Sequence, residues 1–300
     1  MTRPRAALLL AAAMLLTGSN VPLGKLIVAE VPVYPFILFR FVVASLALAL
    51  LVRGEPGPPL TSLDNRQRID LVAMALLGMV GFSAFMLEGV KRTAAADAGI
   101  ITATMPAVVA LMGMLFMGDR LGGRGLASIA LAVGGLVLVQ ATGAVREAAS
   151  SGLGNLLVGL AVIGEASFVL LGKRLTPPLK PIRLALGANL AGLVLTLPLA
   201  LPELRTLDLL AIQPELWGLS LWYVLSAGVF CLLLWYRAIP HVETWLAGLA
   251  TAAIPIAALA VAAALLGEAI GPARLAGAAL VIAGIVLGAS RSKTGDGGRS

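Results

Sequence analysis

Apolar segments about as long as a membrane is thick follow one another along nearly the whole chain, with short polar stretches between them. A helix that crosses the hydrocarbon core of a bilayer needs about 20 predominantly apolar residues. The pattern therefore predicts an all-α integral membrane protein with ten transmembrane helices. The predicted spans are Ala6–Val28, Pro35–Val52, Leu71–Lys91, Ala95–Met117, Leu126–Thr142, Gly152–Arg174, Ile182–Leu201, Leu216–Arg237, Thr244–Gly267 and Pro272–Ala289.

One stretch of the sequence occurs twice. Ala98–Pro106 (AGIITATMP) and Ala247–Pro255 (AGLATAAIP) share alanine, glycine, threonine, alanine and proline at the same five positions. The register continues without a gap to Gly118 and Gly267, each of which precedes an acidic residue. A constant offset kept over such a length indicates that one half of the protein is a copy of the other.

The two copies, residues 6–142 and 152–289, each contain five predicted spans. Because five is an odd number, the second copy must enter the membrane from the opposite side. The sequence therefore predicts two inverted five-helix repeats around a central cavity, an architecture of secondary transporters. Residues 290–300 are polar and glycine-rich, and they are predicted to form a disordered cytoplasmic tail.

The composition excludes an ordinary soluble protein. Hydrophobic residues make up 59% of the chain and charged residues only 12%, which is too little charge to cover a water-exposed surface. The formal net charge of +7 is explained by Lys and Arg in cytoplasmic loops rather than by nucleic-acid binding. Most basic residues lie on the side of the N-terminus, which predicts that both termini lie in the cytoplasm.

Metal and disulfide chemistry are not expected. The chain has one cysteine, Cys231, and one histidine, His241. An intrachain disulfide needs two cysteines, and a zinc site needs three or four clustered ligands. We therefore predict no cofactor and no metal.

The repeated prolines are candidate hinges. Pro106 and Pro255 each lie within a span, and a proline leaves the carbonyl four residues earlier without its helical donor. Those carbonyls belong to Thr102 and Thr251, whose side chains can rebuild the local hydrogen bonding. Such a helix can line a cavity and bend, although a static kink that aids packing is the alternative.

Glu165 is the most informative charged residue, since it falls within the sixth predicted span. A carboxylate at that depth costs about 2.5–3.5 kcal/mol on insertion scales, so it should face a cavity or a partner. It is a candidate to bind a substrate ammonium group or to exchange a proton, and a paired structural acid is the alternative. Its counterpart in the first repeat is Thr17, which makes the predicted site asymmetric.

Other polar and aromatic residues complete the candidate site. Ser19 and Asn20 share a turn with Thr17 in the first span and can bind a polar substrate group or bridge two helices. The aromatic candidates either line the cavity or contact lipid; they are Trp222, Tyr223, Phe82 and Phe85.

Charges near span ends have simpler explanations. Glu88 precedes Lys91 and Arg92 by one helical turn, which favours a surface ion pair, with a gate as the alternative. Arg40 lies a few residues inside the second span and is expected to extend its side chain outward to the membrane surface.

The repeated motifs resemble the EamA-type transporters of the drug/metabolite transporter superfamily. Ala98–Pro106 with Gly118–Leu121, and Ala247–Pro255 with Gly267-Glu268, are similar to the family's fourth and ninth spans, and the likeness extends over nearly the whole chain. Asp119 departs from the family's usual Glu. The resemblance implies ten spans and transport of small organic molecules, including amino acids. Together with the small size and the Ala-, Leu- and Gly-rich composition, it implies an amino-acid exporter of a bacterial inner membrane.

The sequence allows three classes of function to be compared: a transporter, a membrane enzyme and a channel. No motif for a membrane enzyme and no charged ring or carbonyl filter of a channel is visible. We therefore expect a secondary transporter that works by alternating access, not an enzyme, and the resemblance implies that it exports amino acids. The alternative is proton-coupled efflux of cationic drugs. The expected partners are a small-molecule substrate and the bilayer, and the sequence leaves monomer and homodimer open.

Overall fold

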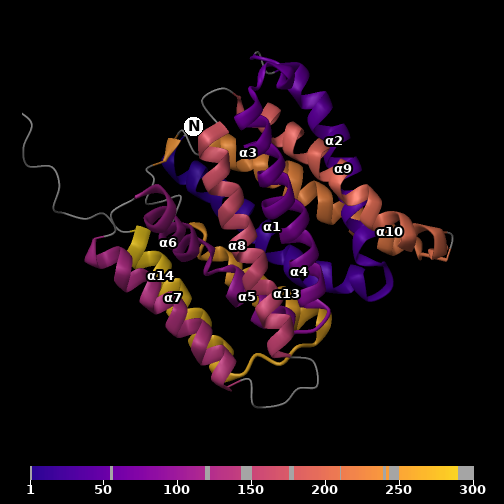
Figure 1. Ribbon diagram of the computed structural model, residues 1–300. Coiled ribbons are helices and arrows are strands. Elements are labelled where there is room, and N and C mark those ends of the chain that lie inside the picture. Colours follow the sequence, from indigo (N-terminus) through magenta and orange to yellow (C-terminus); the bar gives the residue numbers. More distant parts are fainter. Residues whose placement is uncertain are drawn as a thin grey trace, which may run out of the picture.

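The computed structural model describes residues 2–54, 57–118, 122–142, 151–175, 179–209, 211–238, 241–242 and 250–289. Every regular element within these ranges is helical (Figure 1). In chain order the elements are α1 (Arg3–Glu30), α2 (Val33–Leu51), η1 (Val52–Gly54), η2 (Leu60–Ser62), α3 (Asn65–Ala75), η3 (Leu76–Gly81), α4 (Phe82–Val90), α5 (Ala95–Thr102), α6 (Met105–Met117), α7 (Gly123–Thr142), α8 (Gly152–Leu175), α9 (Pro181–Thr206), α10 (Pro214–Leu225), η4 (Ser226–Phe230), α11 (Cys231–Ala238), α13 (Ala253–Leu266) and α14 (Pro272–Ala289).

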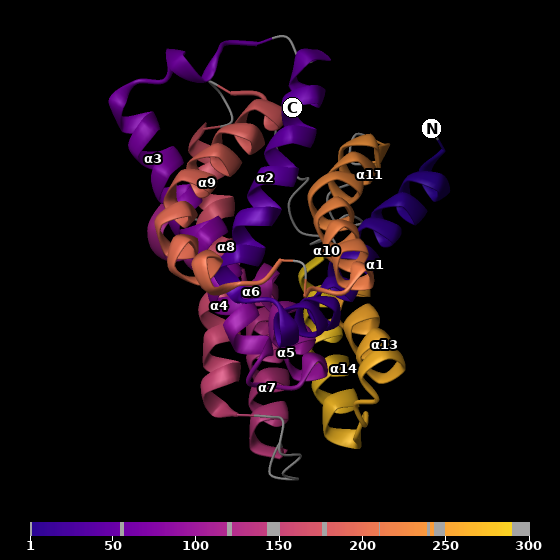
Figure 2. The ribbon, with the colours of Figure 1, turned by 90° about the vertical axis from the view of Figure 1, so that its right-hand side faces the viewer.

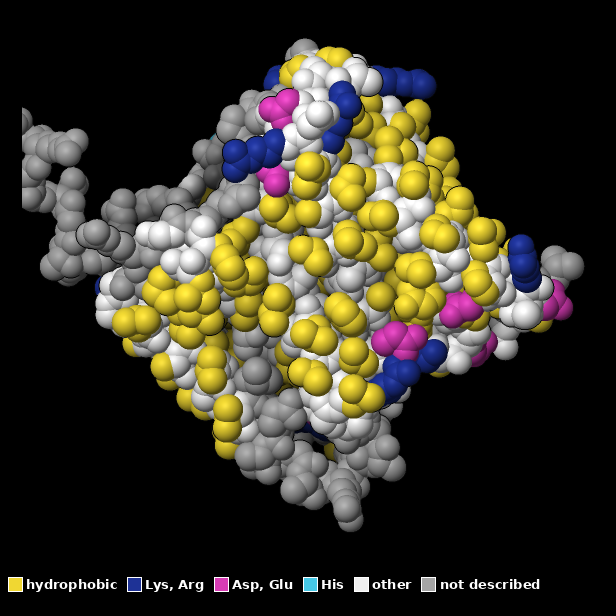
Figure 3. Space-filling view, viewed as in Figure 1, with side chains coloured by type: hydrophobic (Ala, Val, Ile, Leu, Met, Phe, Trp, Pro, Cys, Tyr) yellow, Lys and Arg dark blue, Asp and Glu magenta, His cyan; other side chains and the backbone are white. Residues whose placement is uncertain are grey.

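The helices form a multi-pass membrane protein. Among the described residues, seven continuous helical stretches are long and apolar enough to cross a bilayer, and Ala253–Leu266 and Pro272–Leu287 are shorter apolar helices. A space-filling view shows a broad hydrophobic surface, with charged side chains gathered near the ends of the helices (Figure 3). The predicted start of the ninth span at Thr244 and the predicted tail 290–300 lie outside the described residues.

Four of the predicted spans are not uninterrupted α-helices where the structure describes them; in the ninth, Thr251 and Ala252 form a turn directly before α13. The third contains the π-helical turn η3 and the eighth contains the π-helical turn η4, at nearly corresponding positions of the two halves. In the fourth span α5 ends at Thr102 and α6 begins at Met105, directly before Pro106. Such irregular turns expose backbone groups inside a membrane only where protein or a cavity covers them.

The duplication extends to the backbone at the helix ends. Both α6 and α13 end in a left-handed glycine, Gly118 with φ 73° and Gly267 with φ 64°. Glycine adopts this conformation without the steric cost that a Cβ atom would bring. These two glycines are the ones that the repeated sequence aligns.

Helices of one half pack mainly against helices of the other. The first span, α1, contacts α11 and α13 of the second half, and the sixth span, α8, correspondingly contacts η3, α4, α5 and α6 of the first half. The pairs α2 with α9 and α7 with α14 join equivalent spans. The contacts of α1 with the second half thus resemble those of α8 with the first half.

Small residues allow the closest of these contacts. A Cβ atom at Gly99 would lie 2.2 Å from the Ala258 Cβ, so α5 and α13 nearly touch. In the α7–α14 pair, a Cβ atom at Gly284 would lie 2.8 Å from the Ser128 carbonyl oxygen. The Ser128 hydroxyl donates to the Gly284 carbonyl at 2.6 Å. Gly284 of the tenth span is thus used for packing within the chain.

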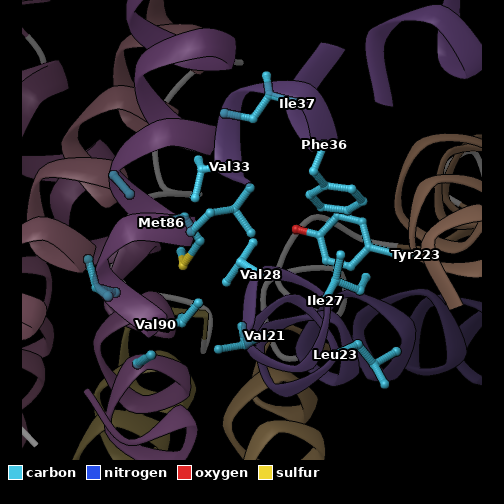
Figure 4. Close-up of a cluster of buried hydrophobic side chains, with 14 of the residues drawn as sticks. Val21, Leu23, Ile27, Val28, Val33, Phe36, Ile37, Met86, Val90 and Tyr223 are labelled. Carbon is cyan, nitrogen blue, oxygen red and sulfur yellow. The ribbon is translucent and has the colours of Figure 1, made fainter. Parts of the chain in front are cut away.

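The bundle is closed at one end and divided at the other. We call the end at which α1 begins the N-side and the end at which α1 finishes the far side. The main buried cluster joins the far-side halves of α1, α2, α4, α5, α8 and α10 (Figure 4). On the N-side, one cluster joins α3, α8 and α9, and separate clusters join α1 to α11 and α13. Figure 2 shows these two groups of helices apart from one another.

Candidate functional site

Four polar side chains from different helices lie at mid-depth of the bundle, and we call them the polar layer. At 1.5 Å per residue from the far-side end of its helix, Arg40 lies about 10 Å deep, Tyr223 about 14 Å, Asn20 about 15 Å and Glu165 about 20 Å. The hydrocarbon core is about 30 Å thick. These groups therefore lie where a polar side chain has no access to bulk water unless the bundle provides it.

Arg40 faces the inside of the bundle. Its guanidinium interacts electrostatically with Glu165 and Tyr223. The guanidinium carbon, Cζ, lies 4.9 Å from the centre of the Phe41 ring. Its Nε is buried and has no hydrogen-bond partner. The expectation that Arg40 extends outward to the membrane surface is therefore wrong, because the fold places an opposite charge on the inner side of α2. Hydrophobic periodicity gave no sign of this.

Glu165 is half-buried and is the second charge of the layer. It interacts electrostatically with Arg40. Among the described groups, however, no Lys or Arg nitrogen lies within 4.0 Å of its carboxylate and no hydrogen bond reaches it. Arg40 and Glu165 thus attract one another without touching.

The backbone beside Glu165 packs directly on a π-helical turn. A Cβ atom at Gly164 would lie 2.6 Å from the Leu77 carbonyl oxygen, and one at Gly78 would lie 2.3 Å from the Phe168 Cβ. Only glycine at both positions allows α8 to approach η3 this closely. The Glu165 segment and η3 are therefore in direct backbone contact.

Asn20 and Tyr223 form the other side of the layer. The Ser226 hydroxyl donates to the Asn20 Oδ1 at 3.0 Å, while the Asn20 Nδ2 is buried without a partner. Tyr223 packs edge-on against Phe36, with ring centres 5.3 Å apart, and Figure 4 shows its hydroxyl directed into the cluster. The Asn20 contact lies on η4, so the second π-helical turn also adjoins the layer.

The remaining residues predicted for the site are placed differently. The Thr17 hydroxyl donates to the Ala13 carbonyl and lies 3.3 Å from the Cys231 Sγ, and the Ser19 hydroxyl donates to the Leu16 carbonyl at 2.8 Å. Both hydroxyls are thus engaged with backbone of their own helix. Their predicted role in binding substrate stays a prediction.

The aromatic candidates separate into two groups. Tyr223 is buried and Phe82 packs at the edge of the main cluster, whereas Phe85 is 39% exposed and Trp222 is 46% exposed. The last two face the outside of the bundle and do not join the polar layer. Adjacent positions on one helix, such as Trp222 and Tyr223, point about 100° apart, which explains the difference.

The repeated threonines and prolines lie at the helix interruptions. The Thr102 hydroxyl donates to the Ala98 carbonyl at 2.7 Å, and the Thr104 hydroxyl donates to the Ile101 carbonyl at 2.7 Å. Side-chain donors thus occupy carbonyls around the break between α5 and α6. In the second half, Thr251 lies in the turn before α13, and Pro255 is buried in its first turn.

An ion-pair network closes the far side, and the sequence did not predict it. The Glu268 carboxylate accepts hydrogen bonds from the Ala95 and Ala96 amides at 2.8 and 2.9 Å and pairs with the Lys25 Nζ at 2.9 Å. Lys25 also donates to the Thr93 carbonyl. We call Lys25, Glu268 and the two amides the far-side latch; a neighbouring pair joins Asp97 to Arg274 at 2.7 Å.

The repeated motif held a usable signal for the latch. Glu268 directly follows the terminal glycine of α13, so its position at a helix end was visible in the sequence. A carboxylate is favourable at the positive N-terminus of a helix such as α5. What the sequence lacked was the identity of the helix that Glu268 caps.

Glu88 makes a different kind of contact. It pairs with Arg92 on the same helical run, and the two side chains are 27% and 44% exposed. The pair therefore lies at the surface of the far side, apart from the latch. The predicted gating role of Glu88 stays a prediction.

No group of three His, Cys, Asp or Glu residues that could hold a metal ion occurs in the described part of the chain. An apolar pocket lies outside the polar layer, between the far-side ends of α2, α9 and α10. Phe36, Phe39 and Trp217 line it, and the last two pack edge-on with ring centres 5.5 Å apart. Because Phe36 also contacts Tyr223, one aromatic ring separates this pocket from the layer.

Comparison with known proteins identifies the family. The model of the EamA-like transporter family matches residues 4–141 and again residues 152–289. The uncharacterized transporter YetK of Bacillus subtilis is 31% identical over 290 residues, which is 96% of this chain and 87% of that protein. A probable terminal-alkyne amino-acid exporter of Streptantibioticus cattleyicolor is 29% identical, over 83% of this chain and 82% of its own.

A solved crystal structure has the same fold. It aligns with a TM-score of 0.65 over 95% of this chain and 96% of that chain, at 17% sequence identity. The family model covers both predicted halves, the relatives named as transporters span most of the chain, and the helical membrane fold agrees. The chain therefore belongs to the EamA-like transporter family.

Proposed function

We propose that the protein is a secondary transporter that exports amino acids from the cytoplasm across a bacterial inner membrane by alternating access. In this orientation the N-side faces the cytoplasm. Membership of a transporter family supports movement of small molecules. The similarity to a probable amino-acid exporter supports the narrower substrate class.

The observation that carries the proposal is the polar layer. A guanidinium and a carboxylate lie near mid-membrane without direct contact, beside a tyrosine and a carboxamide with an unused donor. Isolated intramembrane charges are costly, and they mark substrate or ion pathways. An amino acid carries the two charges and the hydrogen-bonding groups that this layer can satisfy.

The helix geometry supports alternating access. The far side is held by the latch and the main buried cluster, while the N-side helices belong to separate clusters. The structure then corresponds to a state that is closed toward the far side. The π-helical turns η3 and η4 and the break between α5 and α6 adjoin the layer, and they provide the places at which the helices can bend.

Counterflow in proteoliposomes tests the proposal. Vesicles that contain the purified protein and an excess of unlabelled leucine, phenylalanine or threonine should accumulate the same labelled amino acid transiently. Protein-free vesicles supply the background. If no amino acid in a panel of all twenty shows counterflow above that background, the proposed substrate class is wrong.

A second candidate function rests on Glu165. A carboxylate without a described ion-pair partner within 4.0 Å can bind a cation or exchange a proton, as in proton-coupled efflux of cationic compounds. In that case an imposed pH gradient should drive loss of a cationic dye such as ethidium from cells. The Glu165→Gln variant should abolish this loss, and an unchanged rate would exclude the candidate.

A further inference from the structure

We propose that Arg40 and Glu165 act as one receptor for a zwitterion, in which Arg40 binds the α-carboxylate of the substrate and Glu165 binds its α-ammonium group. This inference rests on the proposed function and deepens it. It assigns Arg40 to substrate recognition and predicts that both charges must be present on the same solute.

The first argument is the arrangement of the two charges. They come from α2 and α8, one from each half of the chain, and they interact electrostatically across the interior. No described basic nitrogen lies within 4.0 Å of the Glu165 carboxylate, so the two side chains are not in direct contact. A molecule with an ammonium group and a carboxylate group on one carbon atom can bind both side chains through charge-assisted hydrogen bonds of about 2.8 Å each.

The second argument is the unused hydrogen-bonding capacity. The Arg40 Nε is buried and donates to nothing, although a guanidinium presents a planar fork suited to a carboxylate. The Asn20 Nδ2 is a second buried donor without a partner. Buried polar groups are nearly always paired in folded proteins, so the Arg40 Nε and the Asn20 Nδ2 are donors that the carboxylate of a bound solute could use.

The third argument concerns charge balance during transport. An ion pair without substrate and an ion pair bridged by a zwitterion have the same net charge. A lone amine or a lone carboxylate would instead leave one member of the pair uncompensated in a medium where isolated charges are unfavourable. The receptor should therefore discriminate against molecules that carry only one of the two charges.

A set of substrate derivatives tests this directly at pH 6, where the α-amino group is protonated. Leucine, phenylalanine and threonine would each be assayed in counterflow as the zwitterion, as the methyl ester, which is only cationic, and as the N-acetyl derivative, which is only anionic. For the wild-type protein we expect either single-charge derivative to be transported about ten- to hundredfold less efficiently than its parent.

Two variants should change this preference in opposite directions. The Arg40→Gln variant should no longer transport the zwitterion and should instead prefer the methyl ester, because Glu165 is left without a counter-charge. Glu165→Gln should gain preference for the N-acetyl derivative. Arg40→Lys, which keeps the positive charge, should retain the zwitterion preference. Arg205→Gln and Glu215→Gln are matched controls, since both side chains are exposed at helix ends.

The outcomes separate the two proposals. If wild-type protein transports none of the nine solutes or other amino acids, the proposed function fails. If it transports amino acids and their single-charge derivatives equally well, only the zwitterion receptor is wrong. The zwitterion receptor is also wrong if Arg40→Gln and Glu165→Gln reduce transport of the zwitterion, the methyl ester and the N-acetyl derivative by the same factor. The wild-type comparison requires no variant, so the receptor can be refuted even if a variant does not fold.

Discussion

Neutralising Glu268 should open the far side of the bundle. The substitution Glu268→Gln keeps the size of the side chain but removes its charge. The carboxylate accepts hydrogen bonds from the Ala95 and Ala96 amides and pairs with Lys25, and its side chain is only 9% exposed. The glutamine amide has one acceptor oxygen and an NH₂ group, so it can retain only one of the two backbone bonds.

The size of the effect follows from these contacts. One hydrogen bond to a charged group contributes about 1.5–3 kcal/mol, and a carboxylate at a helix N-terminus about 0.3–1 kcal/mol. Water replaces part of both when the far side opens. The closed state should therefore lose about 2 kcal/mol of stabilisation relative to the open state. This changes the ratio of molecules with a closed far side to molecules with an open far side about 30-fold.

Cysteine labelling in detergent measures this ratio. Val28 is 2% exposed in the far-side cluster, so a Val28→Cys probe in a Cys231→Ser background should react slowly with a maleimide. Adding Glu268→Gln should raise the labelling rate about 30-fold. Lys25→Met should raise the labelling rate by a similar factor. Because the two side chains form one contact, the increase in the double variant should be smaller than the product of the two single-variant increases.

Glu88→Gln is the control for this experiment. It removes an acidic residue from an ion pair on the same side of the membrane, but that pair joins two exposed residues of one helical run. Exposed pairs of this kind contribute little, so the labelling rate should stay within about twofold of the parent protein. An unchanged rate in the Glu268 variant, or an equal increase in the Glu88 variant, would show that the latch does not hold the far side closed.

Three further predictions concern packing and the polar layer. Gly78→Ala should lower the thermal unfolding temperature in detergent by an amount equivalent to about 1–3 kcal/mol, because its Cβ atom would meet Phe168, whereas Gly218→Ala, with nothing within 4 Å, should not lower it. Arg40→Gln and Glu165→Gln should each reduce the yield of folded protein, and the double variant should recover much of that yield. The reason is that one uncompensated charge inside the membrane is less favourable than no charge at all. A double variant with a lower yield than both single variants would contradict this. Trp222→Ala, at an exposed position, should leave counterflow within about twofold of wild type, and a loss of transport would place the residue in the substrate path after all.

Much of the architecture could be predicted because it depends on quantities that a sequence states directly. Length and apolarity set the positions of the spans, since the bilayer imposes both. The repeated glycines at 118 and 267 end α6 and α13 with positive φ, as a residue without a Cβ atom allows. Glu165 stood out because any charge within a span is exceptional.

The direction in which each side chain points could not be predicted. In a soluble helix the polar face shows which side meets water, but in these spans every face is apolar and the periodic signal is weak. Arg40 therefore looked like a residue of the membrane surface, and Trp222 looked as internal as Tyr223. The π-helical turns η3 and η4 rotate the following residues further and leave no trace in hydropathy.

The sequence by itself determined that this chain crosses the membrane repeatedly, that it consists of two related halves, and that one acidic residue lies deep within a span. Only the tertiary structure decided that Arg40 is buried within electrostatic reach of Glu165 and that Glu268 caps α5 next to Lys25. The physical reason is that burial in a bilayer fixes the depth of a residue along its helix. Its rotation and its partners are set by packing between helices distant in sequence.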